Sequence, residues 1–324
     1  MPASQQENYR SGGGQFRPAG TGYFVRFIQL NQSNYLIMVN TDDLQLSKLN
    51  YEGLKTLVKW AEEEGWNPGA HDADVFWATD PDGFYGYFYN GSLIAGGSIV
   101  SYDKLFGFMG FFIVRPDYRL GGIGRKLWYQ RRDILLSKLN KGASIGMDGV
   151  VAMQPFYIKG GFENAFRDER HEKIGMEFKS NSKVSAICEG DIRSILAYDQ
   201  KCFGFPRPQF MKPWLRQPDV KTFKYIDGDK VKGFAIIRKA VKGYKVCPLF
   251  ADNEEIAGEL YQACLSSVVG EPLYIDIPVI NPAALVLTIK YNTTYVFECA
   301  RMYLGKAPEI DIDKVFGITT FELG

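Results

Sequence analysis

An apolar run that ends at a proline and leads into a glycine-rich loop limits the possible folds of this chain more than any other feature. The run covers residues 108–114 and stops before Pro116, and the loop RLGGIG occupies residues 119–124. Beyond the loop, apolar residues recur at helical spacing from Ile123 to Leu139. These features predict a strand, a turn and a helix in direct succession.

Further runs extend this unit on both sides. The apolar residues at 149–153 predict a buried strand after the helix, and three- and four-residue spacing at 44–65 predicts a helix that ends at Gly65. Strands and helices therefore alternate, and we expect an α/β fold (an α+β mixed sheet).

Two hairpin signals indicate that the chain repeats this order. Asn-Gly at 90–91 separates apolar runs at 84–89 and 93–101, and Asp-Gly at 227–228 plays the same part in the second half. The second hairpin is followed by a predicted strand, helix and strand at 244–250, 254–268 and 272–277. Self-similarity on this scale indicates a duplicated domain.

The polar stretch KSNSK at 179–183 is the predicted join between the two copies. We expect a flexible tail at 1–22, which is polar and rich in glycine, a first domain at 23–178 and a second domain at 184–324.

Composition excludes several classes of protein. Hydrophobic residues make up 46% and charged residues 23% of the 324 residues, as in a folded protein with a real core. The net charge of +1 gives no field that would attract nucleic acid or an anionic membrane. No run approaches ~18 apolar residues, so we expect no membrane span.

The five cysteines are widely spaced and form no Cys-x-x-Cys pair, and the chain has two histidines. We therefore expect no metal site, no disulfide framework and a cytoplasmic location. The oligomeric state stays open.

The glycine loop has the chemistry of an anion site. Its three glycines would let a ligand approach the backbone, and the first amides of the following helix lack internal partners. Cations at a helix N-terminus cost about 0.3–1 kcal/mol each, and Arg119, Arg125 and Lys126 gather there. A bound diphosphate would offset that cost. The alternative is an ordinary glycine-rich turn with solvated charges.

The loop resembles the Arg/Gln-x-x-Gly-x-Gly/Ala motif of the GNAT superfamily of N-acetyltransferases. The resemblance covers about residues 30–170, and the rest resembles the second, degenerate module of a tandem GNAT subfamily, in phrases such as CPLFAD, NPAAL and VFGITTFELG. It implies two tandem GNAT-like acyl-CoA N-acyltransferase folds and the transfer of an acetyl group from acetyl-CoA to a primary amine.

The resemblance also implies roles for particular residues. The backbone of one strand would hold the pantetheine arm, through Phe112, Ile113 and Val114. The loop would hold the pyrophosphate, through Arg119, Leu120, Gly121, Gly122, Ile123, Gly124 and Arg125. Tyr157, which begins a Tyr-x-x-x-Gly-Phe element, would supply a proton to the leaving thiolate. A tyrosine that serves only for packing is the alternative.

The general base is expected among acidic residues before the first hairpin, where the superfamily builds its acceptor site. The group comprises Glu62, Glu63, Glu64, Asp72, Asp74, Asp80 and Asp82, and Glu64 and Asp72 are the preferred candidates. A solvated acidic face is the alternative.

In the second half, acidic residues replace the glycine loop, at Asp252, Glu254 and Glu255, and Thr288 stands where the tyrosine would be. We expect this module neither to bind CoA in the same way nor to catalyse, but to shape the acceptor pocket. The acceptor is expected to be a small-molecule amine. The alternatives are an acetyltransferase acting on protein lysines or N-termini, and a non-catalytic acyl-CoA sensor.

Overall fold

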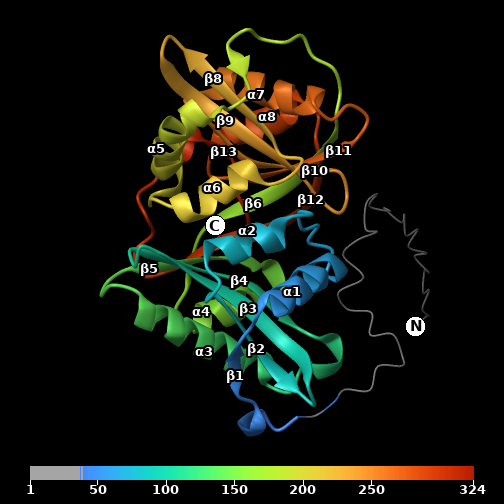
Figure 1. Ribbon diagram of the computed structural model, residues 1–324, viewed down its shortest axis with the longest axis vertical. Helices are drawn as coiled ribbons and strands as arrows, with labels where there is room; N and C mark the ends of the chain where they lie inside the picture. The colour runs from blue at the N-terminus through green and yellow to red at the C-terminus, as the bar shows by residue number, and fades with distance from the viewer. Residues whose placement is uncertain (1–36, 38) are drawn as a thin grey trace, which may run out of the picture.

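A computed structural model describes residues 37 and 39–324, so the predicted tail at 1–22 lies outside the described residues. Two modules are stacked along the long axis of the molecule (Figure 1). The first module runs from β1 to β6. Its elements are β1 (Leu46–Lys48), α1 (Tyr51–Glu63), α2 (Asp72–Thr79), β2 (Phe84–Tyr89), β3 (Ser92–Tyr102), β4 (Phe106–Val114), α3 (Ile123–Lys138), β5 (Ser144–Val150), α4 (Gln154–Lys159) and β6 (Glu163–Ile174).

The second module repeats this order and adds one strand at its end. Its elements are β7 (Val184–Ser185), α5 (Ile192–Phe203), α6 (Pro208–Arg216), β8 (Lys221–Asp227), β9 (Lys230–Lys239), β10 (Tyr244–Ala251), α7 (Glu254–Ser266), β11 (Pro272–Pro278), α8 (Pro282–Lys290), β12 (Thr294–Leu304) and β13 (Val315–Gly317). Short 3-10 turns lie between elements, at Thr41–Asp43, Pro116–Tyr118, Val151–Met153, Glu189–Asp191 and Ile312–Lys314. The repeat confirms the predicted duplication.

The two modules exchange their long last strands, β6 and β12. In the one mixed sheet the strands follow the order β1-β2-β3-β4-β5-β12-β6-β11-β10-β9-β8-β7. Strand β12 of the second module thus lies between β5 and β6, and β6 of the first module lies between β12 and β11. The modules therefore share one continuous sheet, and an approximate two-fold axis passes between β6 and β12.

Two buried ion pairs lock this exchange and obey the same symmetry. Arg301 of β12 bonds Asp148 of β5, with Nε–Oδ1 at 2.7 Å. Arg170 of β6 bonds Asp276 of β11, with Nε–Oδ1 at 2.6 Å. Each pair joins neighbours in the sheet register and crosses from one module to the other.

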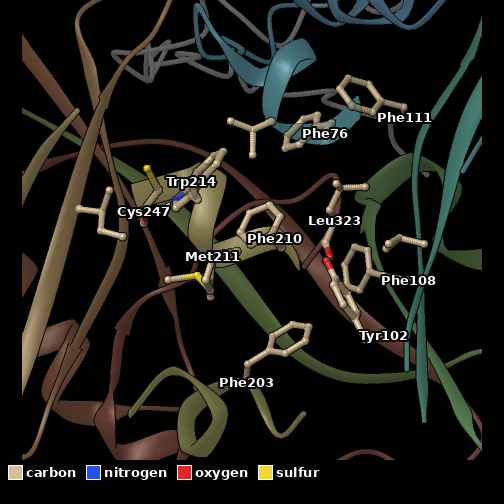
Figure 2. Close-up of a cluster of buried hydrophobic side chains, with 14 of the residues drawn as sticks. Phe76, Tyr102, Phe108, Phe111, Phe203, Phe210, Met211, Trp214, Cys247 and Leu323 are labelled. Atoms are coloured by element: carbon tan, nitrogen blue, oxygen red, sulfur yellow. Dashed lines mark hydrogen bonds between the residues drawn. The ribbon is translucent and has the colours of Figure 1, made fainter. Parts of the chain in front are cut away.

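An aromatic core fills the space between the modules. Helices α2 and α6 face each other there and contribute side chains to it (Figures 1 and 2). Phe76 of α2 stacks on Trp214 of α6, with ring centroids 6.2 Å apart and planes 10° apart. The hydroxyl of Tyr102 donates to the carbonyl of Leu323 at 2.8 Å, so the segment after β13 also enters this core.

Both Asn-Gly and Asp-Gly hairpins are confirmed, and Asn90, Gly91 and Gly228 have positive φ. The predicted helix at 44–65 is wrong in its first turns: residues 46–48 pair with β2, and α1 begins at Tyr51. Asn50 fixes that start, since its side chain accepts from the Gly53 amide at 2.9 Å.

The strand predicted at 149–153 lies earlier in the structure, at Ser144–Val150, and a 3-10 turn follows it. The apolar run is misleading because Val151 is exposed. Helix α2 was not predicted, since its eight residues are too few to show a clear period.

Over residues 37 and 39–324, no helix is both long and apolar enough to cross a membrane. In the same part of the chain no three histidine, cysteine or acidic side chains gather as metal ligands would. Cys188 is exposed, the other four cysteines are buried, and all five are free thiols. The cytoplasmic location stays a prediction.

Candidate active site

Strands β4 and β5 separate halfway along their length. They pair in parallel only from Phe106–Ser144 to Met109–Met147. Beyond that point β4 contains a bulge, where Phe111 has φ of 47° and the register with β3 shifts. Pairing with β3 nevertheless continues to Val114, so the other edge of residues 110–114 faces no strand among the described residues. We call this gap the β4–β5 opening.

The glycine loop lies at the end of this opening. Leu120 and Gly122 adopt positive φ of 70° and 80°, and Gly122 is the residue before the first turn of α3. Gly124 packs closely on β4, because a Cβ there would be 3.2 Å from Val114 Cγ2 and 3.3 Å from the Phe112 ring. The absence of a side chain therefore brings the helix N-terminus against the free edge of β4.

The amides of this loop are free to bind an anion. The backbone bond from Lys126 N–H to Gly122 C=O, at 3.1 Å, starts α3. In the described part of the chain the N–H groups of residues 121–125 donate to no other residue. A helix N-terminus with unbonded amides is a natural site for phosphate.

The three cations near the loop have different partners. Arg119 pairs with Glu64 and also donates from Nε to the Val114 carbonyl at 2.8 Å. Lys126 donates to the carbonyl of Thr41. Arg125 is exposed and lies over the Tyr129 ring at 5.9 Å, so its charge is available to a ligand.

Tyr157 lies on α4, beside the β4–β5 opening. Its ring packs against Phe112 of β4, with centroids 6.5 Å apart, and stacks on Trp128 of α3 at 5.9 Å. Gly149 of β5 makes room for it, because a Cβ there would be 2.9 Å from Tyr157 Cδ2. The Tyr157 hydroxyl bonds none of the described residues, and burial raises the pKa of Tyr157 above its ordinary value. The tyrosine therefore stays protonated at neutral pH.

The structure thus gathers most of the predicted residues around one opening. These are Phe112, Ile113, Val114, Arg119, Leu120, Gly121, Gly122, Ile123, Gly124, Arg125 and Tyr157. The side chain of Ile123 is buried in the core, so only its backbone can face a ligand.

Glu64 follows the last turn of α1 and joins this group through its ion pair with Arg119. The pair ties the glycine loop to α1. Glu64 is therefore engaged with a cation, which makes it a loop anchor more than a free base.

The hypothesis that Asp72 acts as a base does not fit its surroundings. Asp72 is fully buried, and both oxygens bond Arg238 of β9, at 2.7 and 2.9 Å. The Gly69 amide donates to it as well, at 2.7 Å. Although burial raises the pKa of Asp72, Arg238 brings it below its ordinary value. Because both of its oxygens are bonded to Arg238 in the buried interior, Asp72 joins the two modules instead.

The other acidic residues before the hairpin do not gather at the opening either. Asp74 accepts from the Tyr51 hydroxyl, and Asp82 pairs with Lys48 at 2.9 Å. Neither of these two carboxylates is therefore a free base at the opening.

Sequence reasoning missed two residues at the bulge. Arg131 of α3 donates from Nη2 to the carbonyls of Ser98 and Gly110, at 2.8 and 3.0 Å. From the opposite face, the Glu322 backbone lies directly against Gly110, and its carbonyl accepts from Ser98 Oγ at 3.2 Å. A buried arginine within a charged helix gives no sequence signal, and neither does a contact across 200 residues.

The corresponding opening in the second module, between β10 and β11, is filled. Strands β10 and β11 pair from Tyr244–Leu273 to Val246–Ile275, and then β13 pairs with β10 at Leu249 and Phe250. The amide of Ile318, next to β13, donates to the Asp276 carbonyl of β11 at 2.8 Å. Helix α7 is capped too, since Asn253 Oδ1 accepts from the Ile256 amide at 3.0 Å. The second opening thus offers neither the free strand edge nor the uncapped helix N-terminus that the first one has.

Two family models match the chain, one in each module. The model described as the acetyltransferase (GNAT) family matches residues 51–162, and that described as an acetyltransferase (GNAT) domain matches residues 195–317. Both matches fall inside the predicted domains. The domain boundaries themselves stay predictions.

Curated and solved proteins agree with these matches. A holothin acyltransferase from a Pseudoalteromonas species is 30% identical over 268 residues, which cover 82% of this chain and 90% of that protein. A putative acetyltransferase from Pyrococcus horikoshii has a similar structure, with a TM-score of 0.75 at 21% identity over 88% of this chain and 98% of that one.

A tandem GNAT protein of the clavulanic acid biosynthesis pathway also has a similar fold, with a TM-score of 0.55 at 10% identity over 82% of this chain and 99% of that one. The identity and coverage of the holothin relative, together with the two model matches, place the chain in one family. The chain belongs to the GNAT family of acyltransferases and carries one GNAT fold in each half.

Proposed function

We propose that this protein transfers an acetyl group from acetyl-CoA to the primary amine of a small molecule, at the β4–β5 opening of the first module. One observation carries the proposal. The free edge of β4, the unbonded amides at 121–125 and Tyr157, whose ring packs on Phe112 of β4 and whose hydroxyl has no partner among the described residues, lie around the same opening. An acyl-CoA needs a backbone edge for its pantetheine, amides for its pyrophosphate and an acid for its sulfur.

The chemistry follows from these groups. The neutral amine attacks the thioester carbonyl carbon, an N–C bond forms, and the C–S bond breaks. The sulfur takes a proton from the Tyr157 hydroxyl, and the proton lost by the amine restores the tyrosine through solvent. The products are the acetamide and free CoA thiol, so the step needs no other reactant.

The acceptor is proposed to be small because the second module covers the face of β4 opposite α3. Helices α2 and α6 pack together there, and Glu322 and Leu323 lie against β3 and β4. The curated relative of 30% identity is named for acyl transfer to one compound, holothin, which supports a small acceptor.

Gly121→Glu tests the donor site. A Cβ at Gly121 meets nothing within 4 Å and the residue has no positive φ, so the fold tolerates the change. The new carboxylate would face the pyrophosphate, and we expect the Kd for CoA to rise at least about 100-fold. Gly121→Ala is the matched control and should bind CoA within about threefold of the wild type. Equal binding by both variants would refute the assignment of the loop.

Turnover tests the reaction and the acceptor. Polyamines, amino acids, aminoglycosides and peptides are each offered with acetyl-CoA, and thiol release is recorded. We expect release with a small amine and a loss of about 100-fold in kcat for Tyr157→Phe, with CoA binding unchanged. Release with peptides alone would identify a protein acetyltransferase, and CoA binding without any release would identify a sensor.

A further inference from the structure

Arg131 is a buried cation without a counter-ion. Its side chain is fully buried between α3 and the sheet, and burial lowers its pKa to about 9. Five arginines of the described chain are buried, and the other four each bond an aspartate through two nitrogens. Those pairs are Arg170–Asp276, Arg207–Asp199, Arg238–Asp72 and Arg301–Asp148.

Burying an unpaired charge costs free energy of folding. A buried arginine without a counter-ion therefore needs another reason for its presence. The Nε and Nη1 atoms of Arg131 have no hydrogen-bond partner among the described residues. Packing alone does not require a guanidinium here, because the neighbouring inward residues of α3, Leu127 and Leu135, are apolar.

The contacts that Arg131 does make lie at the β4 bulge. Its Nη2 donates to the carbonyls of Ser98 of β3 and Gly110 of β4, which face each other as the last regular pair of β4 before the register shift. Gly97 precedes Ser98 on β3, and a Cβ there would overlap Arg131 Nη1. The guanidinium thus clamps the two strands where β4 departs from regular pairing.

Arg131 also faces the candidate acid. The ring of Phe112 contacts both groups, at 5.7 Å from the guanidinium carbon and 6.5 Å from the Tyr157 ring centroid. The charged or titratable groups that act on the Tyr157 hydroxyl are Arg131 from α3 and Cys299 from β12. After burial, which raises the pKa of Tyr157, Arg131 is the largest influence and lowers it.

We propose that Arg131 is a positioning residue for acyl transfer, which clamps the bulge that opens β4 from β5 and holds a positive charge beside the Tyr157 hydroxyl. The inference rests on the proposed function. Negative charge develops on the thiolate and on the tyrosine oxygen as the proton moves. A fixed cation in a site that excludes water stabilises that charge more than it would in water.

A double-mutant cycle separates this role from ordinary packing. Arg131→Met keeps the length and apolar body of the side chain and removes its charge. We expect kcat to fall about 10- to 100-fold while the Kd for CoA changes less than about threefold. In the Tyr157→Phe background the same change should cost less than about threefold in kcat, because the group through which Arg131 acts is already gone.

Two further variants keep the test decisive if Arg131→Met is unstable. Arg131→Lys retains the charge and should recover at least about a third of the wild-type kcat. Gly97→Ala displaces the guanidinium without removing it and should lower kcat about tenfold. Gly107→Ala is its control on β4, because a Cβ there meets only the flexible side chains of Leu135 and Leu139, at 2.9 Å.

The outcomes are distinct. If the wild type acetylates an amine and the losses of Arg131→Met and Tyr157→Phe multiply independently, Arg131 is structural and the inference fails alone. Full activity of Arg131→Met also overturns it. If the wild type acetylates no amine, the proposed function fails and this inference with it.

Discussion

The two modules of this protein contain the same opening in a sheet and treat it in opposite ways. In the first module, the edge of β4 on the side of β5 faces no described strand beyond Met109, and the backbone amides at the start of the following helix have no partners. In the second module, β13 occupies the matching edge of β10, and Asn253 caps the helix. The connection also differs, since residues 115–122 join β4 to α3 and only 252–253 join β10 to α7.

This difference teaches that the GNAT fold produces the opening whether or not a ligand is to enter it. Parallel strands that begin together and then separate leave unpaired backbone groups, and buried groups of that kind need partners. The second module satisfies them with its own chain. The first leaves them for another molecule, which is why we assign the donor site there alone.

The number of CoA molecules bound per chain tests the difference between the modules, and we expect it to give the largest effect. Calorimetric titration of the full chain with CoA should give one site per chain, and Gly121→Glu should remove that site. Asn253→Glu changes the capped helix of the second module and should leave binding intact. Two sites per chain, or binding that survives Gly121→Glu and fails in Asn253→Glu, would reverse our assignment of the modules.

Removing the ion pairs of the exchanged strands β6 and β12 should have a second, smaller effect, on the free energy of unfolding. Arg301→Met leaves Asp148 and Asp168 buried without a nearby cation, and we expect a loss of about 3–5 kcal/mol in the free energy of unfolding. Arg170→Met, its symmetry mate, removes the ion-pair partner of Asp276 and should cost less, because Lys245 and Arg238 still act on that carboxylate. Denaturant unfolding measures both.

Because the sheet is continuous, each variant should still unfold in one transition. Two separate transitions would show that the modules are independent, despite the exchange of β6 and β12.

Asp168 gives the smallest predicted effect and marks where the symmetry fails. It lies opposite Cys299 at the centre of the exchanged strands, and neither of its oxygens has a partner among the described residues. Burial, with Asp148 nearby, raises the pKa of Asp168 well above its ordinary value. Burial also raises the pKa of Asp148 to about 6.

A raised pKa means that the folded state holds the proton more tightly than the unfolded state. For Asp148 this contribution to stability is complete below the unfolded pKa of 3.8 and is lost as the pH rises through about 6. For Asp168, whose folded pKa also lies well above 3.8, the loss likewise begins as the pH rises above the unfolded pKa. We expect Asp168→Asn, which stays neutral, to raise Tm at pH 7 by about 2–4 °C and to flatten this part of the pH profile. An equal Tm for wild type and variant at pH 7 would mean that Asp168 carries no such penalty.

Local chemistry made part of the site predictable. The loop at 119–124 is recognisable by its glycines, of which Gly122 adopts positive φ, and a Tyr-x-x-x-Gly-Phe element marked Tyr157, which lies on the short helix α4. The acidic residues could not be sorted in the same way. Whether Glu64 or Asp72 is free depends on Arg119 and Arg238, which are 55 and 166 residues away.

The sequence by itself determined that two copies of one fold follow each other and that only the first has a glycine-rich loop before its central helix. Periodicity, hairpin dipeptides and glycines act over a few residues, so they can be recognised without the fold. Only the tertiary structure decided that the copies exchange strands, that β13 fills the second opening and that Arg131 is buried without a counter-ion at the first. These features arise from strands and side chains that meet across the whole chain, and no local pattern encodes such meetings.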